Sequence, residues 1–108
     1  MERVAVLVPT LRRPEGLAAA LASLMAQEQV GGRLSEIVVV DNDRQPSSRS
    51  VVDGFSDAPV PVIYVHEPRS GVASARNAGL AATQAPLIAF LDDDEIASPR
   101  WLASLLDS

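Results

Sequence analysis

Four consecutive acidic residues follow a short apolar run near the end of the sequence. The run Leu87–Leu91 leads directly into Asp92, Asp93, Asp94 and Glu95. Carboxylates this close together repel one another, and a divalent cation would relieve the repulsion. Mg²⁺ commonly takes one or two carboxylates together with the phosphates of a substrate. Acidic residues are also ordinary turn formers, so for this cluster alone a metal site and a solvated turn are about equally good interpretations.

Three other polar residues could serve the same chemistry. Thr10 and Asp41 each come shortly after an apolar run, and Arg76 lies in the second turn of a predicted helix that opens near Gly71. A helix start with an arginine offers N–H groups and positive charge to phosphates. Taken singly, Asp41 reads as a loop cap and Arg76 as a solvated helix residue. Their meaning therefore depends on the elements that carry them.

Strand and helix patterns alternate along the chain. Short β-branched runs predict buried strands, and periodic apolar stretches that open near Pro, Ser or Gly predict helices. The expected strands are Arg3–Val8, Glu36–Val40, Val62–Glu67 and Leu87–Leu91, and the expected helices cover residues 12–27, 50–55, 70–83 and 99–106. We expect Pro9 to end the first strand and Ser98 to cap the last helix. This order predicts an α/β fold with an open, mainly parallel sheet of about four strands and helices on both faces.

The predicted topology brings the polar residues to one rim. Ligands of open parallel sheets bind beyond the carboxyl ends of the strands, at a switch in strand order. Thr10, Asp41, the acid cluster and the helix start near Gly71 all belong to that rim. We therefore expect a metal–diphosphate site there, with the base and ribose of a nucleotide at the ends of the first two strands.

Length and composition exclude several classes of function. The 108 residues, 47% of them hydrophobic, predict one domain over residues 1–108 without linker or repeat. The formal net charge of −5 argues against a nucleic-acid partner. The absence of cysteine excludes disulfides and thiolate metal sites. No apolar run approaches the roughly 20 residues of a membrane span. We expect a cytoplasmic protein, with membrane association if it forms part of a longer one.

The sequence resembles the family-2 glycosyltransferases, which have the A-type glycosyltransferase fold with a Rossmann-like sheet. The resemblance covers residues 3–106, and its most specific motifs are "GVASARNAGL" followed by "IAFLDDDE". The segments "VAVLVPTLRRPEGLAAALASLMAQ" and "EIVVVDND" precede them in family order and at family spacing. The resemblance implies that this chain is the half of the enzyme that binds a nucleotide-diphosphate sugar together with Mg²⁺ or Mn²⁺.

Five residues outside the acid cluster take roles in nucleotide-sugar binding from this resemblance. Pro9, Thr10 and Leu11 would line the nucleoside. Asp41 would hydrogen-bond the base or ribose, and Arg76 would lie near the base or the phosphates.

The acid cluster would be the DxD motif of the family. Asp94 would bind the divalent ion, and Asp92 would face the ribose or the same ion. Asp93, the variable middle residue, is grouped with the sugar-nucleotide-binding residues without a specific role. Asn42 stands where the family often has a second acid, which leaves a UDP-sugar and a dTDP-sugar both open as donors.

The resemblance also implies that part of the enzyme is missing. The general base of inverting members lies well past the DxD motif, so it is expected beyond Ser108. The catalytic residue and the acceptor are therefore unknown, and we expect the 108-residue chain to be inactive alone. The alternative is a non-catalytic truncated domain that binds nucleotides or self-associates as a homo-oligomer through exposed apolar surface. A phospho-acceptor receiver domain is set aside, because it needs an acid pair after the first strand and a lysine, and this chain has neither.

Overall fold

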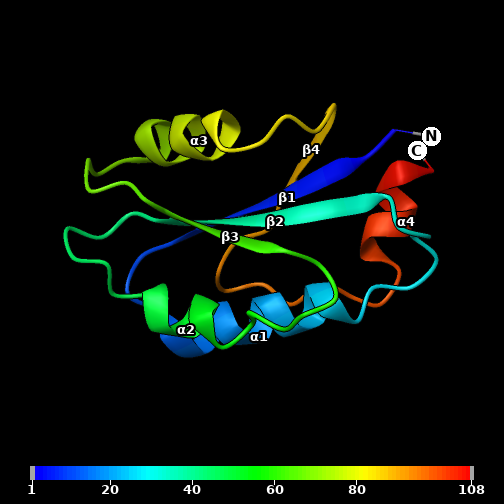
Figure 1. Ribbon diagram of the computed structural model, residues 1–108, viewed down its shortest axis with the longest axis horizontal. Coiled ribbons are helices and arrows are strands. Elements are labelled where there is room, and N and C mark those ends of the chain that lie inside the picture. The colour runs from blue at the N-terminus through cyan, green and yellow to red at the C-terminus, as the bar shows by residue number, and fades with distance from the viewer. Residues whose placement is uncertain (1, 108) are drawn as a thin grey trace.

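The β-branched runs form a single parallel sheet. The computed structural model describes residues 2–107. Its strands are β1 (Val4–Thr10), β2 (Leu34–Asp41), β3 (Val62–His66) and β4 (Leu87–Phe90). They lie in the order β3-β2-β1-β4, and every neighbouring pair is parallel (Figure 1). The predicted open α/β sheet is confirmed.

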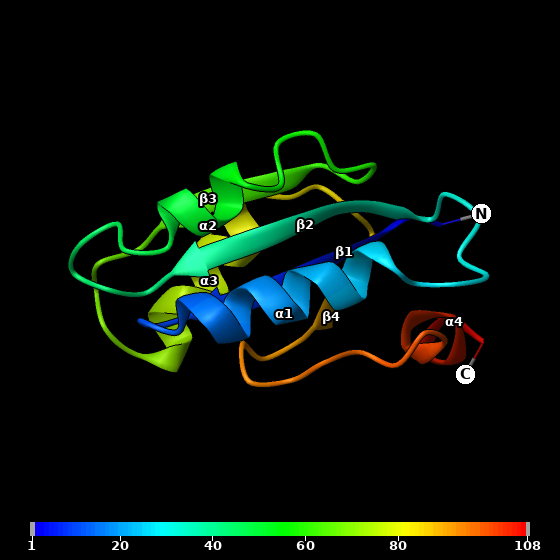
Figure 2. The same ribbon diagram turned by 90° about the horizontal axis from the view of Figure 1, so that it is seen from below.

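Helices cover both faces of this sheet. They are α1 (Pro14–Met25), α2 (Arg49–Asp53), α3 (Val72–Ala81) and α4 (Trp101–Leu106). Figure 1 shows α1 and α2 beneath the sheet and α3 above it, and Figure 2 shows α1 running along the strands. Within residues 2–107, no helix combines the length and the apolar character that a membrane span requires.

Alternate side chains of the central strands enter two different cores. Val6 and Val8 face the larger core with the leucines of α1, whereas Ala5 and Leu7 face α3. Because both faces of β1 are buried, its sequence is a continuous apolar run. On the second face α3 lies close to the sheet, because a Cβ atom at Gly79 would be only 2.7 Å from Leu7 Cδ2.

We expected Pro9 to end the first strand, and this expectation is wrong. Strand β1 continues through Thr10, and Pro9 pairs with Val40 of β2. Leu7 O accepts a hydrogen bond from Leu91 N, on the β4 side of the strand. Because successive residues alternate, Pro9 faces the same side, beyond the last β1–β4 pair, where no N–H is needed.

Ser98 does not cap the last helix either. Helix α4 begins at Trp101, and its N-cap residue Arg100 makes no side-chain capping bond. The partner comes from the segment just after α1, since Gln27 Oε1 accepts from Leu102 N at 2.9 Å and Gln27 Nε2 donates to Ser98 O at 2.8 Å. Gln27, 75 residues before Leu102 in the sequence, thus caps this helix in place of Ser98.

Candidate functional site

A pocket of about 600 Å³ opens beyond the carboxyl ends of the strands. It lies where the order reverses, since β2 and β3 extend from one side of β1 and β4 lies on the other. All but one of the predicted site residues line it: Pro9, Thr10, Leu11, Arg76, Asp92, Asp93 and Asp94. The structure adds residues that the sequence reasoning did not assign to the site: Arg13, Val72, Ala75 and Phe90. Gly71, expected at this rim as the helix start, and Asn42, considered there for the choice of donor, also line the pocket.

The acid cluster forms a tight turn at the mouth of this pocket. Asp92 N donates to Glu95 Oε1 at 2.9 Å, and Glu95 N donates to Asp92 O at 3.1 Å. Asp92 is exposed as a residue, but partial desolvation of its carboxyl, followed by the charges of Glu95, Asp94 and Asp93, raises the pKa of Asp92. The ionised form of Asp92 is therefore disfavoured in the metal-free protein, and a positive charge nearby would favour it.

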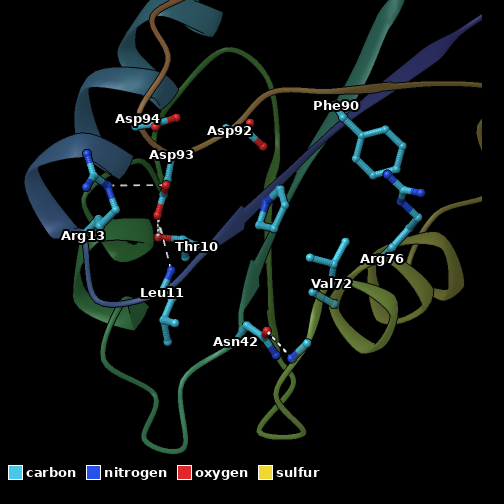
Figure 3. Close-up of a pocket in the computed structure, with 13 residues that line it drawn as sticks. Thr10, Leu11, Arg13, Asn42, Val72, Arg76, Phe90, Asp92, Asp93 and Asp94 are labelled. Carbon is cyan, nitrogen blue, oxygen red and sulfur yellow. Dashed lines mark hydrogen bonds and ion pairs between the residues drawn. The ribbon is translucent and has the colours of Figure 1, made fainter.

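Asp93 is engaged by the loop that follows β1. Its Oδ2 accepts from Thr10 Oγ1 at 2.9 Å and from Leu11 N at 3.3 Å (Figure 3). Its Oδ1 lies 3.4 Å from Arg13 Nε. Both carboxylate oxygens thus have protein partners, and they join the end of β1 to the turn after β4.

Helix α1 supports the same turn by close approach. A Cβ atom at Gly16 would lie 2.5 Å from the backbone oxygen of Asp93, which is closer than real Cβ atoms come. Only glycine allows the first turn of α1 to lie this near the acid turn.

Asp41 is not among the residues that line the pocket. Its side chain is fully buried. Its Oδ2 accepts from Ser48 N at 2.9 Å and from Tyr64 Oη at 2.7 Å, and its Oδ1 accepts from Asp43 N at 3.3 Å. Burial, and then the hydrogen bond to Asp41, raises the pKa of Tyr64. Asp41 thus holds the loop after β2, and its contact with a base or ribose stays a prediction.

The opposite wall of the pocket is partly apolar. The Arg76 guanidinium lies 4.9 Å from the centre of the Phe90 ring, a cation–π contact between α3 and the end of β4. Figure 3 shows this pair across the pocket from Thr10 and Leu11, with Asp92 between the two walls. The alternation of strand β4 was the sequence signal that could have assigned Phe90 to the α3 side.

The acid turn does not form a complete metal cage. Across the described part of the chain, residues 2–107, no three His, Cys, Asp or Glu side chains are grouped closely enough to hold an ion. Asp92 and Asp94, both exposed, supply the carboxylate oxygens that Mg²⁺ and Mn²⁺ prefer. This donor set fits a divalent ion that completes its shell with water and substrate phosphates.

Sequence comparison finds relatives among proteins of sugar metabolism. The succinoglycan biosynthesis protein ExoM of Rhizobium meliloti is 42% identical over 102 residues, which are 94% of this chain and 33% of that protein. The validoxylamine A glucosyltransferase of Streptomyces hygroscopicus subsp. limoneus is 35% identical over 105 residues, 95% of this chain and 23% of that one. The chain therefore spans between about a quarter and a third of the length of these relatives.

Comparison with solved structures also finds a sugar transferase. A mannosyltransferase, PcManGT from Pyrobaculum calidifontis, solved in complex with GDP-Man and Mn²⁺, superposes with a TM-score of 0.85 at 26% sequence identity. The match covers 97% of this chain and 31% of that one. The family model described as glycosyl transferase family 2 matches residues 5–108. Because this match extends over nearly the whole chain, the protein belongs to glycosyl transferase family 2.

Proposed function

We propose that this domain binds a nucleotide-diphosphate sugar with Mg²⁺ or Mn²⁺, as the donor-binding part of a glycosyltransferase. The observation that carries the proposal is the meeting of Asp92 and Asp94 with Arg76 and the start of α3 around one pocket at the strand-order switch. The carboxylates of Asp92 and Asp94 attract a metal cation, whereas the guanidinium of Arg76 attracts the negative charge of a phosphate. A metal–diphosphate pair would satisfy both sets of residues at once.

Each wall of the pocket has a part in this proposal. The N–H groups at the start of α3 and the guanidinium of Arg76 would bind the diphosphate. Pro9, Thr10 and Leu11 would form the wall beside the nucleoside. A divalent ion held by Asp92 and Asp94 would supply positive charge that stabilises the leaving diphosphate in the transfer reaction.

The Pyrobaculum relative supports the proposed ligand class. That protein was solved with GDP-Man and Mn²⁺, at 26% identity to this chain. It supports a nucleotide-diphosphate sugar and a divalent ion as the class of ligand. The sequence left a UDP-sugar and a dTDP-sugar open as donors for this chain. Binding measurements with UDP-, dTDP- and GDP-sugars would identify the nucleotide base.

Sugar transfer is proposed for the whole protein of which such a domain forms part. The chain spans 33% of the length of ExoM and 31% of the Pyrobaculum enzyme. The general base and the acceptor-binding surface would then belong to the rest of the protein. Attack of an acceptor hydroxyl on the anomeric carbon would release the nucleoside diphosphate.

Isothermal titration calorimetry tests the binding proposal. UDP-glucose, dTDP-glucose and GDP-mannose are titrated into the protein with MnCl₂ and with excess EDTA. We expect binding of at least one donor that depends on Mn²⁺ and is lost in Asp94→Ala. The matched control is Asp57→Ala, which removes an exposed aspartate outside the pocket. Equal heats with and without Mn²⁺ for every donor, or full binding by Asp94→Ala, would refute the proposal.

A second groove favours self-association as an alternative function. The outer edge of β4 has no strand partner in the described chain, residues 2–107. Apolar residues of β4 and α4 line the groove beside it: Leu87, Phe90, Trp101, Leu105 and Leu106. A second copy that covers this edge would remove apolar surface from water. Sedimentation velocity over a hundredfold range of concentration would show a rising sedimentation coefficient if the chain dimerises, and a constant monomer value would reject the alternative.

A further inference from the structure

The side chain of Asn42 spans the gap between the end of β2 and the loop that leads into α3. Its Nδ2 donates to Glu67 O and to Arg69 O, both at 2.8 Å. Its Oδ1 accepts from Gly71 N at 3.3 Å (Figure 3). The backbone of Asn42 is itself held by the sheet, because its N–H donates to Thr10 O at 2.9 Å. One side chain thus joins three points of the loop to the rigid end of the sheet.

The loop depends on this side chain for its position. The ladder between β2 and β3 ends where Glu67 N donates to Asp41 O. Past that point, the Glu67 carboxylate binds Arg69 through its N–H and guanidinium, which stiffens the loop internally but does not attach it to the sheet. Among residues 2–107, the hydrogen bonds that tie residues 69–71 to the strands all come from Asn42.

The residues placed by this loop belong to the pocket. Gly71 adopts φ 120° and ψ 152°, a conformation that side-chain-bearing residues rarely take, and it is the N-cap of α3. Val72 follows it directly, and Arg76 lies one turn further on, both in the pocket lining. A shift of the loop would therefore move the wall of the pocket that carries its positive charge.

The chemistry of the contacts requires an amide. Two carbonyl oxygens approach the Nδ2 atom, and a carboxamide supplies two N–H groups for them, together with an oxygen that accepts from Gly71. An aspartate at this position would keep the acceptor but would place a carboxylate oxygen against both carbonyls. The asparagine is therefore not an exchangeable polar residue.

We propose that Asn42 is a positioning residue for donor binding, which holds the start of α3 against the pocket and does not select the nucleobase. Both N–H groups of its amide donate to the protein, so no donor is left to read a base edge, and its oxygen already accepts from Gly71. The proposal deepens the proposed function and rests on it for the ligand that the pocket takes.

The first experiment separates positioning from base reading. Dissociation constants of UDP, dTDP and GDP are measured with Mn²⁺ for the wild type, Asn42→Ala and Asn42→Asp. Asn42→Ala loses all three hydrogen bonds and Asn42→Asp loses the two that Nδ2 donates, so each variant should bind every nucleotide about tenfold more weakly. The ratios among the three constants should remain within about twofold of the wild type. A changed ratio, or wild-type affinity in Asn42→Asp, would overturn the proposal.

A second experiment needs no nucleotide, so it distinguishes failure of this inference from failure of the proposed function. In the ligand-free protein, hydrogen exchange at the Gly71 amide should become at least about tenfold faster in Asn42→Ala, while the Val6 amide of β1 stays protected and reports a folded core. Arg69→Ala, which leaves the backbone oxygen of residue 69 bound to Asn42, should have a smaller effect. Unchanged Gly71 exchange would refute the positioning role. Faster exchange in a protein that binds none of the nucleotides would uphold the role of Asn42 and reject the proposed function.

Discussion

The bond between Thr10 and Asp93 joins two segments that are 83 residues apart, and its strength can be measured. The perturbations are Thr10→Val, Asp93→Ala and the double variant. Thr10 is only 3% exposed, so its hydroxyl would lose its partner in a water-poor site. Valine has nearly the shape of threonine, and the comparison therefore isolates the hydroxyl.

The contacts of Asp93 set the expected magnitude. A hydrogen bond to a charged acceptor contributes about 1.5–3 kcal/mol. The Arg13 ion pair adds at most about 1 kcal/mol, because the Arg13 side chain is 54% exposed. Removing one negative charge from beside Asp92 and Asp94 offsets part of this loss. We expect Asp93→Ala to lower the free energy of unfolding by about 2 kcal/mol and Thr10→Val by about 1–2 kcal/mol.

Urea denaturation of the four proteins gives the coupling energy. We expect the double variant to be less destabilised than the sum of the single variants by about 1–2 kcal/mol. Asp94→Ala is the matched control, since it removes the next, exposed acid, and its effect should stay within about 0.5 kcal/mol or be stabilising. Additivity within about 0.5 kcal/mol would refute the reasoning. So would an Asp93→Ala variant that is more stable than the wild type, because charge repulsion would then outweigh the bond.

Three further predictions concern the neighbouring residues. Gly16→Ala should destabilise the fold by about 1–2 kcal/mol despite better helix propensity, because its Cβ would displace the Asp93 backbone. The same displacement should weaken Mn²⁺-dependent nucleotide binding. Thermal unfolding measures the first effect and calorimetry the second. Asp92→Asn should stabilise the metal-free protein at neutral pH, since the raised pKa of Asp92 shows that its charge is unfavourable there, and thermal melts should show the gain vanishing in acid, where Asp92 is protonated in the wild type. The Arg69 hydrogen bonds lower the pKa of Glu67 from 4.5 to about 2, so the stabilising contribution of Glu67 is present above pH 4.5 and lost as the pH falls toward 2. Glu67→Gln should remove that part of the pH dependence of the free energy of unfolding, as measured by urea titrations at a series of pH values.

Much of the fold follows from local sequence patterns. The two central strands could be recognised because a chain segment buried on both faces must be apolar at successive positions, as in Val4–Val8 and Ile37–Val40. The rim location of the site follows as well, because the carboxyl ends of parallel strands share one edge of a sheet. That reasoning placed Thr10, Arg76 and Asp92 around a common pocket, as the structure has them.

Other features depend on contacts between distant segments. Gln27, just after α1, caps α4, and the middle acid Asp93 binds the end of β1, although no local pattern links either pair. Asp41 lies at the end of its strand, yet Tyr64 from β3 and Ser48 before α2 hold its carboxylate, and it does not line the pocket. Short-range periodicity reports only which face a residue occupies. The order of the strands and the path of each loop decide which partner it meets there: Asp92 N donates to Glu95, whereas the next residue, Asp93, binds Thr10 and Arg13.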